Sequence, residues 1–468
     1  MRKRASATVA FAVAFGLAFV AATARAQPVT LTEDEVVRRA RQSYPMVAAA
    51  RLDGDAAGGD LQAAEGAFDF GLRTRGSLIP LGGYPQGRVD VVAEVPTTLW
   101  GSTLFAGYRW GSDTVADYDG KLVTNDLGEV RVGAAVPTWR NGPIDRRRAN
   151  IERAELGVSV GERGVQQSQL EAARAAALRY WLWVGASLRR DQVETLAIRA
   201  QKRAEDVEER VGRGDLPGID RADAQRSLTV RRQQIVAAER MFQQAAIELS
   251  LFLRRADGTP DLPDPARAPR SMPPLRALPP DAPTSARIAL VRRPDLARLE
   301  LAKKQQEVEA RWAGNQLAPA VDLAAVGSQD LGEGSSKRDP FELELSLMID
   351  VPLDTDAAQG RRRAARASAA RIEVARSLVV DQALAELRDA RAAVTAAAQR
   401  ESLSGEEKSL ADALLEAERD RLTLGESTVF MVDLREQAAL EAAIRQIDAA
   451  IEARRAVVVW RAAAADLL

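Results

Sequence analysis

The same sequence features occur in the same order in both halves of the chain, so we expect the same architecture in each half. Each half has an X-Pro pair in an Ala-rich helical stretch, a Val-Pro pair ending a strand-like run, three consecutive arginines and a glycine-marked turn. In the first half these are Tyr44-Pro45, Val136-Pro137, Arg146-Arg147-Arg148 and Gly214, and in the second they are Arg293-Pro294, Val351-Pro352, Arg361-Arg362-Arg363 and Gly425. A repeat of this kind predicts the shape of the fold, although it indicates nothing yet about the chemistry of the protein. The distance in sequence between matching features is 249 residues at the X-Pro pairs and 215 residues at the Val-Pro pairs. The strand region of the first half therefore contains about 34 more residues than that of the second half.

The first 26 residues predict a secretory signal peptide. A basic region, Arg2-Lys3-Arg4, precedes an apolar run over residues 8–22, and Ala24-Arg25-Ala26 fits the small-x-small cleavage pattern. The mature chain would begin at Gln27, and the alternative is an uncleaved N-terminal anchor. No later stretch reaches the roughly 18 consecutive apolar residues that a membrane-spanning helix needs. We therefore expect an exported protein without a helical membrane anchor.

Cysteine and histidine are both absent from the sequence. Their absence excludes disulfides, a lipid-modified N-terminal cysteine, histidine acid–base catalysis and Cys/His zinc sites. No glycine-rich nucleotide-binding loop followed by lysine is present either. We therefore expect no enzyme activity, no cofactor and no metal site. The formal net charge of −1 also gives no indication of a nucleic-acid partner.

Period-2 alternation predicts strands at about residues 68–139 and again at about 319–352. In the clearest case the apolar residues Phe341, Leu343, Leu345, Leu347, Ile349 and Val351 alternate with Glu342, Glu344, Ser346, Met348 and Asp350. Such alternation places all apolar side chains on one face of the strand. A soluble sandwich strand and a membrane-barrel strand both have this pattern, so the strand alone leaves the two open.

Proline-free stretches rich in helix-forming residues predict two very long helices, at residues 144–211 and 355–424. Each would be about 100 Å long at 1.5 Å per residue, and each precedes a glycine turn and a returning helix. The returning helices have coiled-coil spacing at Leu228, Ile235, Phe242 and Leu249, and at Leu440, Ile444, Ile447, Ile451 and Val458. The alternative is the apolar stripe of a compact helical domain, which helices of this length do not fit.

These elements define the predicted domain organisation. The first repeat spans residues 27–256, and it begins with a helical stretch at about 30–67 in which Thr32 is the N-cap and Glu35 lies three residues on. A proline-rich linker spans 257–283, and the second repeat spans 284–468. The long helices and their returns lie at about 144–254 and 355–467. Together the two repeats make one elongated unit.

A few strands at each of two places leave unpaired sheet edges, which lipid does not tolerate. If the strands lie in a membrane, several copies must close a barrel together. We predict two hairpins, or four strands, per chain, and therefore twelve strands in three chains. The surplus of about 34 residues is either an extended hairpin or an additional pair of strands.

The ordered set of features, present twice, resembles the TolC-like outer-membrane efflux proteins along essentially the whole mature chain. The resemblance implies an α+β membrane protein of two structural repeats of helix, strands, long helix and helix. It also implies a homotrimer: a twelve-stranded β-barrel in outer-membrane lipid, continued by a periplasmic α-helical coiled-coil barrel that contains most of the mass. The partners implied are a periplasmic adaptor protein and an inner-membrane pump.

The resemblance also implies functional positions at the far end of the long helices. The adaptor-facing tips would contain Val211, Gly212 and Gly214, and Leu424, Gly425 and Glu426. Carboxylate rings at the pore entrance would come from Asp220, Asp223 and, less directly, Asp433. The alternative for Asp220 and Asp223 is that they stabilise the start of the returning helix through its dipole. Leu422 and Ser427 replace the Tyr and Arg that hold the entrance shut in some members, so those contacts are not transferable.

The function these features predict is a passive exit duct of a tripartite efflux or type I secretion system, driven by its inner-membrane partner. Drugs, metal ions, exported proteins and polysaccharides all use ducts of this kind, so the cargo stays open. The alternative is a periplasmic coiled-coil protein that tethers the envelope, which leaves the duplicated strands unexplained. A third hypothesis, an exported hydrolase, lacks the cysteine or histidine that most nucleophile–base pairs need.

Overall fold

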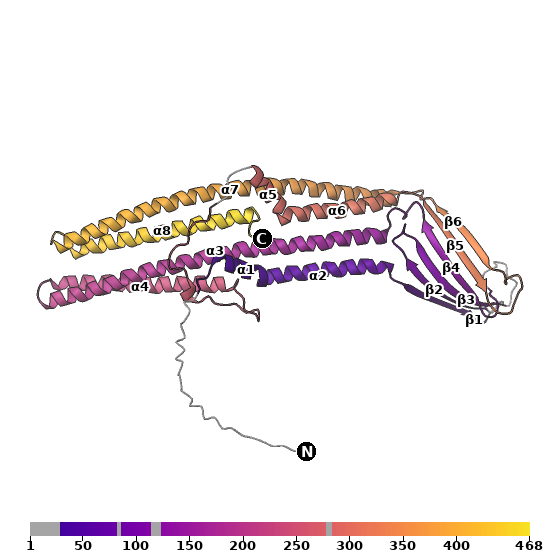
Figure 1. The fold of residues 1–468 in the computed structure, drawn as a ribbon, viewed down its shortest axis with the longest axis horizontal. Helices are drawn as coiled ribbons and strands as arrows, with labels where there is room; N and C mark the ends of the chain where they lie inside the picture. Colours follow the sequence, from indigo (N-terminus) through magenta and orange to yellow (C-terminus); the bar gives the residue numbers. More distant parts are fainter. Residues whose placement is uncertain (1–28, 82–85, 114–122, 278–282) are drawn as a thin grey trace, which may run out of the picture.

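The computed structural model of the chain describes residues 29–81, 86–113, 123–277 and 283–468. The predicted signal peptide lies outside the described residues. The protein is elongated, with helices along most of its length and a single sheet at one end (Figure 1). Because the helices run along the long axis and the sheet lies at one end of it, each helical residue can be located by its distance from the sheet towards the opposite, helical tip.

The two halves contain the same series of four helices. In the first half they are α1 (Glu33–Ser43), α2 (Pro45–Glu65), α3 (Arg146–Gly212) and α4 (Gly218–Ser250). In the second half they are α5 (Pro283–Arg292), α6 (Pro294–Asn315), α7 (Asp356–Thr423) and α8 (Val429–Ala463). With 67 residues in α3 and 68 in α7, each long helix extends about 100 Å. Short 3₁₀ turns lie at Gly66–Phe68 and Pro265–Arg267.

The N-terminal helical stretch is two helices rather than one. Thr32 caps α1 by accepting a hydrogen bond from Glu35 N at 3.2 Å. Tyr44 is extended, with ψ of 134°, and Pro45 begins α2. Proline disfavours helical geometry in the preceding residue and suits the first position of a new helix. Arg293 and Pro294 separate α5 from α6 in the same way.

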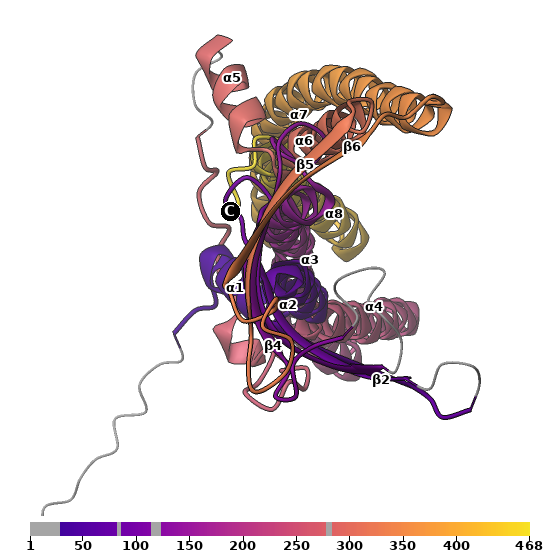
Figure 2. The same cartoon turned by 90° about the vertical axis from the view of Figure 1, so that its right-hand side faces the viewer.

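Six antiparallel strands form one sheet in chain order: β1 (Gly71–Ile79), β2 (Gln86–Pro96), β3 (Thr103–Asp113), β4 (Glu129–Pro137), β5 (Ala320–Asp330) and β6 (Glu342–Asp350). The prediction of four strands per chain is therefore wrong. The surplus of the first half is an additional pair of strands, so that half contributes four and the second half two. Pairing of β4 with β5 joins the halves, and the sheet curves when viewed along the long axis (Figure 2).

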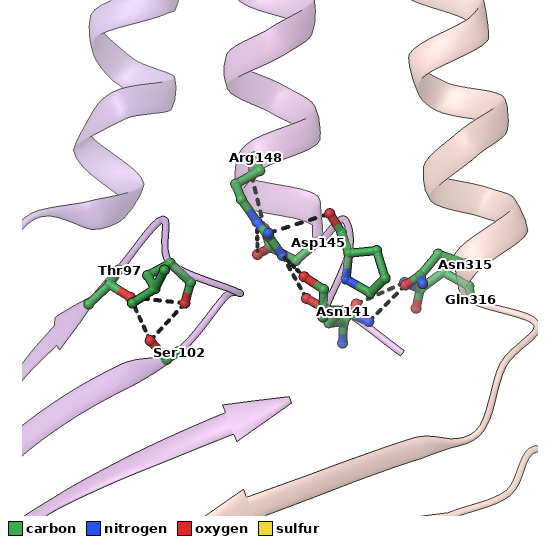
Figure 3. A network of polar contacts seen from close by, with 10 residues as sticks. Thr97, Ser102, Asn141, Asp145, Arg148, Asn315 and Gln316 are labelled. Carbon is green, nitrogen blue, oxygen red and sulfur yellow. Dashed lines mark hydrogen bonds and ion pairs between the residues drawn. The ribbon is translucent and has the colours of Figure 1, made fainter. Parts of the chain in front are cut away.

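Polar contacts fix the sheet to the helices where β4 leads into α3 (Figure 3). Asp145 caps α3 by accepting from Arg148 N at 2.9 Å, and the Arg148 side chain donates to the Asn141 carbonyl at 2.7 Å. Asn141 N also donates to Asn315 Oδ1 at 2.7 Å, and Gln316 donates to Asn141 Oδ1 at 2.9 Å. The ends of α3 and α6 are thereby held at one height beside the sheet.

The largest apolar core lies about midway along the helices. Trp183 is fully buried and stacks on Phe242 with ring centroids 6.1 Å apart, which joins α3 to α4. Tyr180 donates a hydrogen bond to the Leu31 carbonyl at 3.0 Å. Burial, together with Glu33 and Asp34, raises the pKa of Tyr180 above its ordinary range. The phenol therefore stays neutral in the core.

The proline-rich segment packs against this core instead of hanging free between the repeats. Arg454 of α8, 5 % exposed, donates to the Pro273 carbonyl at 2.6 Å and pairs with Glu401 of α7 at 2.6 Å. Arg267 donates to the Val29 carbonyl at 2.8 Å. The segment thus packs against the middle of the helical body.

Candidate functional site

The sheet is inverted relative to the sheet of a soluble protein, because its apolar face is the exposed one. Leu72 of β1 is 66 % exposed, Val132 of β4 is 60 % exposed and Leu345 of β6 is 75 % exposed. These side chains share one face of the sheet: Leu72 and Val132 belong to one row of paired residues across the strands, and that row reaches Leu343, two residues before Leu345. An apolar face that continues across a whole sheet marks an interaction surface, and lipid is the solvent that such a face fits.

The opposite face has charges that alternate from strand to strand. Arg75, Asp90, Arg109 and Glu129 are successive partners across β1 to β4. Arg109 lies 3.4 Å from Asp90 and 3.6 Å from Glu129, and Arg131 pairs with Asp90 at 2.8 Å. The positive and negative charges of this ladder offset one another, so this face of the sheet is polar without a strong excess of either sign of charge.

The end of the sheet nearest the helices has exposed aromatic residues. Trp100 lies in the β2–β3 turn and is 54 % exposed, and Trp139 follows β4 and is 58 % exposed. A hydrogen bond of 2.6 Å between the Thr97 and Ser102 hydroxyls closes the turn (Figure 3). Exposed tryptophan beside an apolar band is typical of a membrane–water interface.

The far ends of the long helices have the same turn in both repeats. Gly214 has φ of +84° and Gly425 has φ of +79°, the left-handed conformation that glycine adopts without strain. In each turn, the backbone N–H of the residue after the glycine donates a hydrogen bond back to the last turn of the preceding helix. Asp215 N donates to the Arg210 carbonyl at 2.9 Å, and Glu426 N donates to the Arg421 carbonyl at 2.9 Å. This is a Schellman closure, and it brings α4 and α8 back alongside α3 and α7.

The sequence-predicted tip residues all lie on or beside these two turns. Val211 and Gly212 end α3, Leu424 follows α7, and Gly214, Gly425 and Glu426 are exposed. Asp220 lies in the first turn of α4, where its carboxylate also suits the helix dipole. Asp223 is exposed one turn further on.

Asp433 is placed differently from the other two carboxylates, because it is paired within the chain. Its Oδ1 lies 3.1 Å from Arg203 of α3 and accepts a hydrogen bond from the Ser227 hydroxyl of α4 at 2.9 Å. Arg231 of α4, 3 % exposed, approaches the same oxygen at 3.9 Å. Asp433 therefore links α8 to both helices of the other hairpin.

Glu436, one turn after Asp433, completes this network and was not predicted from the sequence. It is 3 % exposed and pairs with Arg203 of α3 and with Arg419 of α7, the latter at 2.7 Å. Burial alone would lower the pKa of Arg419, but Glu436 and Glu416 outweigh it and keep that pKa above its ordinary value. We call Arg203, Arg231, Arg419, Asp433 and Glu436 the tip network. It joins all four helices near the tip.

Ser427, one of the positions at which the expected closing side chain is replaced, makes a contact within its own hairpin. Its hydroxyl donates to Glu418 Oε1 at 2.5 Å. Glu418 is 6 % exposed and also lies 3.7 Å from Arg435. The contacts of Glu418 with Ser427 and Arg435 therefore stabilise the α7–α8 turn in addition to the tip network.

Two further properties limit the chemistry of the described residues. In the described ranges, every helix is either too short or too polar to serve as a membrane span. Across those same ranges, no group of three or more acidic side chains is arranged to hold a metal ion.

Comparison with solved structures identifies the fold. The chain is similar to the CmeC outer membrane channel of Campylobacter jejuni, with a TM-score of 0.63 and 14 % identity over 92 % of this chain and 85 % of that one. It is also similar to the outer membrane protein VceC of Vibrio cholerae, with a TM-score of 0.62 and 15 % identity over 92 % and 96 %. The MtrE outer membrane channel of Neisseria gonorrhoeae, solved in its open state, matches with 0.63 and 15 % over 92 % and 88 %.

No protein-family model and no curated protein matches the sequence. The similarity in structure nevertheless covers nearly the whole of this chain and most of each channel, so it extends to the sheet as well as to the helices. The chain has the fold of these outer-membrane channels. The resemblance to TolC-like proteins predicted from the sequence is confirmed at the level of the fold.

Proposed function

We propose that the protein is a passive exit duct of the outer membrane, the outermost part of a tripartite efflux or type I secretion system. The observation that carries this proposal is the inverted sheet at one end of a helical body about 100 Å long. The sheet fits the lipid bilayer, and the helices are long enough to cross much of the periplasm. The similar solved structures described as outer membrane channels add support from the fold.

Three copies close the duct in this proposal, because the sheet formed by the described residues leaves its two edge strands, β1 and β6, each without a partner on one side. Three copies of a six-stranded sheet make eighteen strands, in place of the twelve expected from the sequence. Six strands spaced ~4.8 Å apart and tilted ~40° span about 38 Å of circumference. Four helices, α2, α3, α6 and α7, span roughly 36–40 Å at interaxial distances of 9–10 Å. The barrel and the tunnel therefore have the same circumference.

The matched circumference has a consequence for transport. A barrel of eighteen strands is in the range of the porins, which enclose an aqueous channel. The duct then keeps one width from the helices through the membrane, without narrowing at the sheet. The narrow point lies at the tip, where α3, α4, α7 and α8 come together.

We place the entrance at this tip, in contact with a periplasmic adaptor that links the duct to an inner-membrane pump. The adaptor-facing surface consists of the two glycine turns at Gly214 and Gly425. Asp220 and Asp223 contribute rings of three carboxylates that favour cations, and Asp433 joins them when the tip network opens. The pump supplies the energy, and the duct itself performs no chemistry.

An envelope tether is the weaker alternative. A tether needs the long helices, but it has no use for an exposed apolar face on a six-stranded sheet with two open edges. Such a face in water would aggregate. The sheet therefore favours the duct.

The test is electron microscopy of the mature protein purified in detergent, followed by conductance measurements in planar lipid bilayers. We expect a three-fold hollow particle well over 100 Å long, eighteen strands in the barrel, and ion conductance after insertion. A thin monomeric or dimeric rod without a lumen, which does not conduct, would contradict the duct and favour the tether.

A further inference from the structure

Three arginines near the start of α7 line one pocket at the sheet end of the helical body. The pocket has a volume of about 550 Å³, and its walls are formed by Leu317, Gln359, Arg362, Arg363, Arg366 and Ala367. Within the described ranges, none of the three guanidinium groups takes part in an ion pair or a hydrogen bond. We call Arg362, Arg363 and Arg366 the α7 basic cluster. It gathers three positive charges around one pocket, and no carboxylate of the described chain is paired with them.

The first repeat has an equivalent run of arginines, and two of its three charges are paired within the chain. Arg146 pairs with a glutamate of α6 at 3.1 Å, and Arg148 pairs with Asp145, the N-cap of α3, at 2.8 Å. The position that corresponds to Asp145 in the second repeat, 215 residues later, is Gly360. Arg363 therefore has no such carboxylate beside it. The unpaired charge at the start of α7 is a difference between the repeats, and it needs a partner from outside the chain.

The pocket begins at the height of the exposed tryptophan that follows β4. Leu317 forms its wall on the side of the sheet, in the short segment between α6 and β5. On either side of Leu317 this segment is bound to the residues after β4: Asn315 Nδ2 donates to the Trp139 carbonyl at 3.3 Å, and Arg140 N donates to the Pro319 carbonyl at 3.2 Å. Because Trp139 marks the proposed membrane–water interface, the pocket lies directly on the helical side of that interface.

The arginines lie at the depth of lipid headgroups. A Cβ added at Gly314, near the end of α6, would lie 3.5 Å from Arg362 Nε, so this guanidinium lies only three residues of chain below Leu317. From Gln359 to Arg366 the polar wall of the pocket extends about 10 Å along α7. The headgroup layer of a bilayer is about 5–7 Å thick on each side of the hydrocarbon. Long arginine side chains extend towards such a layer, so all three charges are within its reach.

The pocket faces the convex side of the curved sheet. In Figure 2 the layer of helices runs from α2 at the bottom to α7 at the top, and α1 and α5 lie to the left, on the convex side. Because α7 runs away from the viewer, successive residues turn clockwise by about 100°. Ala365 is buried and faces α6, which lies below α7 in this view. Arg362, Arg366 and Gln359 lie about 60°, 100° and 120° clockwise from Ala365, which is the convex side. In a closed ring the pocket therefore opens outwards.

From these observations we infer that the α7 basic cluster binds the phosphate of an anionic phospholipid in the periplasmic leaflet of the outer membrane, one lipid to each chain. The inference rests on the proposed membrane orientation of the duct and assigns a ligand to its outer surface. Guanidinium groups bind phosphate oxygens in a bidentate manner, and a pocket of this volume is in the range of small-molecule sites. Leu317 and Ala367 suit the apolar part of a lipid, which a free phosphate ion lacks. A bound headgroup fixes the depth of the duct in the membrane.

Native mass spectrometry measures this binding directly. The mature protein is purified in detergent, stripped of lipid and titrated with phosphatidylglycerol, and with zwitterionic phosphatidylethanolamine as the comparison lipid. We expect the natural chain to bind one phosphatidylglycerol per chain, more tightly than phosphatidylethanolamine. The variant R362Q/R363Q/R366Q should bind phosphatidylglycerol about 100-fold more weakly, as expected when three basic residues at an anionic headgroup are lost. Equal affinity of the natural chain and this variant would overturn the inference.

The matched control is R226Q/R240Q/R388Q, which removes three exposed arginines of α4 and of the middle of α7, far from the sheet. It should keep the affinity of the natural chain for phosphatidylglycerol. Equal weakening in the control would show that binding follows the total charge, and the assignment to the pocket would be wrong. If the triple glutamine variant does not fold, the single variant R366Q decides. It should bind about 5-fold more weakly, and unchanged affinity would overturn the inference.

Inorganic phosphate and particle mass separate a lipid from the other possible occupants. If inorganic phosphate at the same concentration displaces phosphatidylglycerol, the pocket takes the free ion and the lipid assignment is wrong. If R362Q/R363Q/R366Q loses the trimeric mass without lipid while the control keeps it, the arginines pair with carboxylates of a neighbouring copy, and the assignment is again wrong. A natural trimer that conducts but does not prefer phosphatidylglycerol would overturn the lipid site and leave the duct standing. A monomeric rod that does not conduct would overturn both.

Discussion

Arg203 of α3 and Glu436 of α8 form an ion pair between the two helical hairpins, although they are 233 residues apart in the sequence. Glu436 is almost fully buried and is also paired with Arg419. Removing one partner from a buried charge network leaves the others without compensation, which typically costs about 3–5 kcal/mol. The tip network is therefore suited to hold the hairpins together, and to release them when its pairs are broken.

The first prediction is that E436Q opens the tip more readily than the natural chain does. The amide keeps the shape of the side chain but loses the charge that attracts Arg203 and Arg419. We expect a higher single-channel conductance or open fraction in planar bilayers at low salt. The control is E401Q, which breaks the pair with Arg454 inside the α7–α8 hairpin and leaves the link between hairpins intact. Identical conductance of E436Q and E401Q would show that the tip network does not hold the entrance.

The sequence predicted the long helices well because their signals are local. The absence of proline and the richness in helix-forming residues placed helices at 144–211 and 355–424, close to the observed α3 and α7. The number of strands was not predictable in the same way. The surplus residues of the first half alternate like strands, but alternation does not say whether an extra segment extends a hairpin or joins the sheet.

The tip network was missed for a different physical reason. An ion pair between hairpins depends on which helix faces meet, and periodicity within one helix does not determine that. One signal was present: Glu436 lies four residues after Val432 and four before Leu440, both of which are buried. A carboxylate at that position of an apolar stripe has to find a buried partner. The spacing alone, however, does not identify Arg203 as that partner.

The second prediction concerns two glycines of α3 that differ only in their surroundings. A Cβ added at Gly185 would lie 2.9 Å from Ile451 Cγ1 in the core, whereas one at Gly164 would meet nothing within 4 Å. Alanine at Gly164 should stabilise the helix by up to about 1 kcal/mol. Alanine at Gly185 forces the core apart and typically costs about 1–3 kcal/mol.

Thermal denaturation of both variants at the same protein and detergent concentration measures this difference. We expect the midpoint of G164A to rise or stay unchanged, and that of G185A to fall. Equal midpoints would mean that α3 and α8 are less tightly packed at Ile451 than the distances indicate.

The third prediction is a loss of stability at alkaline pH that depends on Tyr180. Its pKa in the folded protein is raised by burial, and then by Glu33 and Asp34. The stabilisation is therefore fully present below the ordinary tyrosine pKa of about 10, and it is lost as the pH rises through the higher folded value. Unfolding midpoints between pH 8 and 11.5 should fall less steeply for Y180F than for the natural chain. At pH 8, Y180F should cost about 1 kcal/mol, because its hydrogen bond to Leu31 is lost. Parallel pH profiles of the two proteins would contradict the buried, neutral phenol.

The fourth prediction compares two neighbouring residues of β6 that point to opposite faces of the sheet. Leu345 is 75 % exposed on the apolar face, and Ser346 lies on the polar face with Glu342 and Asp350. If the apolar face meets lipid, arginine at Leu345 costs about 2–4 kcal/mol near the bilayer midplane, whereas arginine at Ser346 enters water. We expect L345R to fail to assemble in the outer membrane and S346R to assemble and conduct with a shifted ion selectivity. Membrane fractionation, followed by conductance of the recovered protein, measures both. If the two variants assemble equally well, the apolar face is not in contact with lipid, and the proposed orientation of the sheet is wrong.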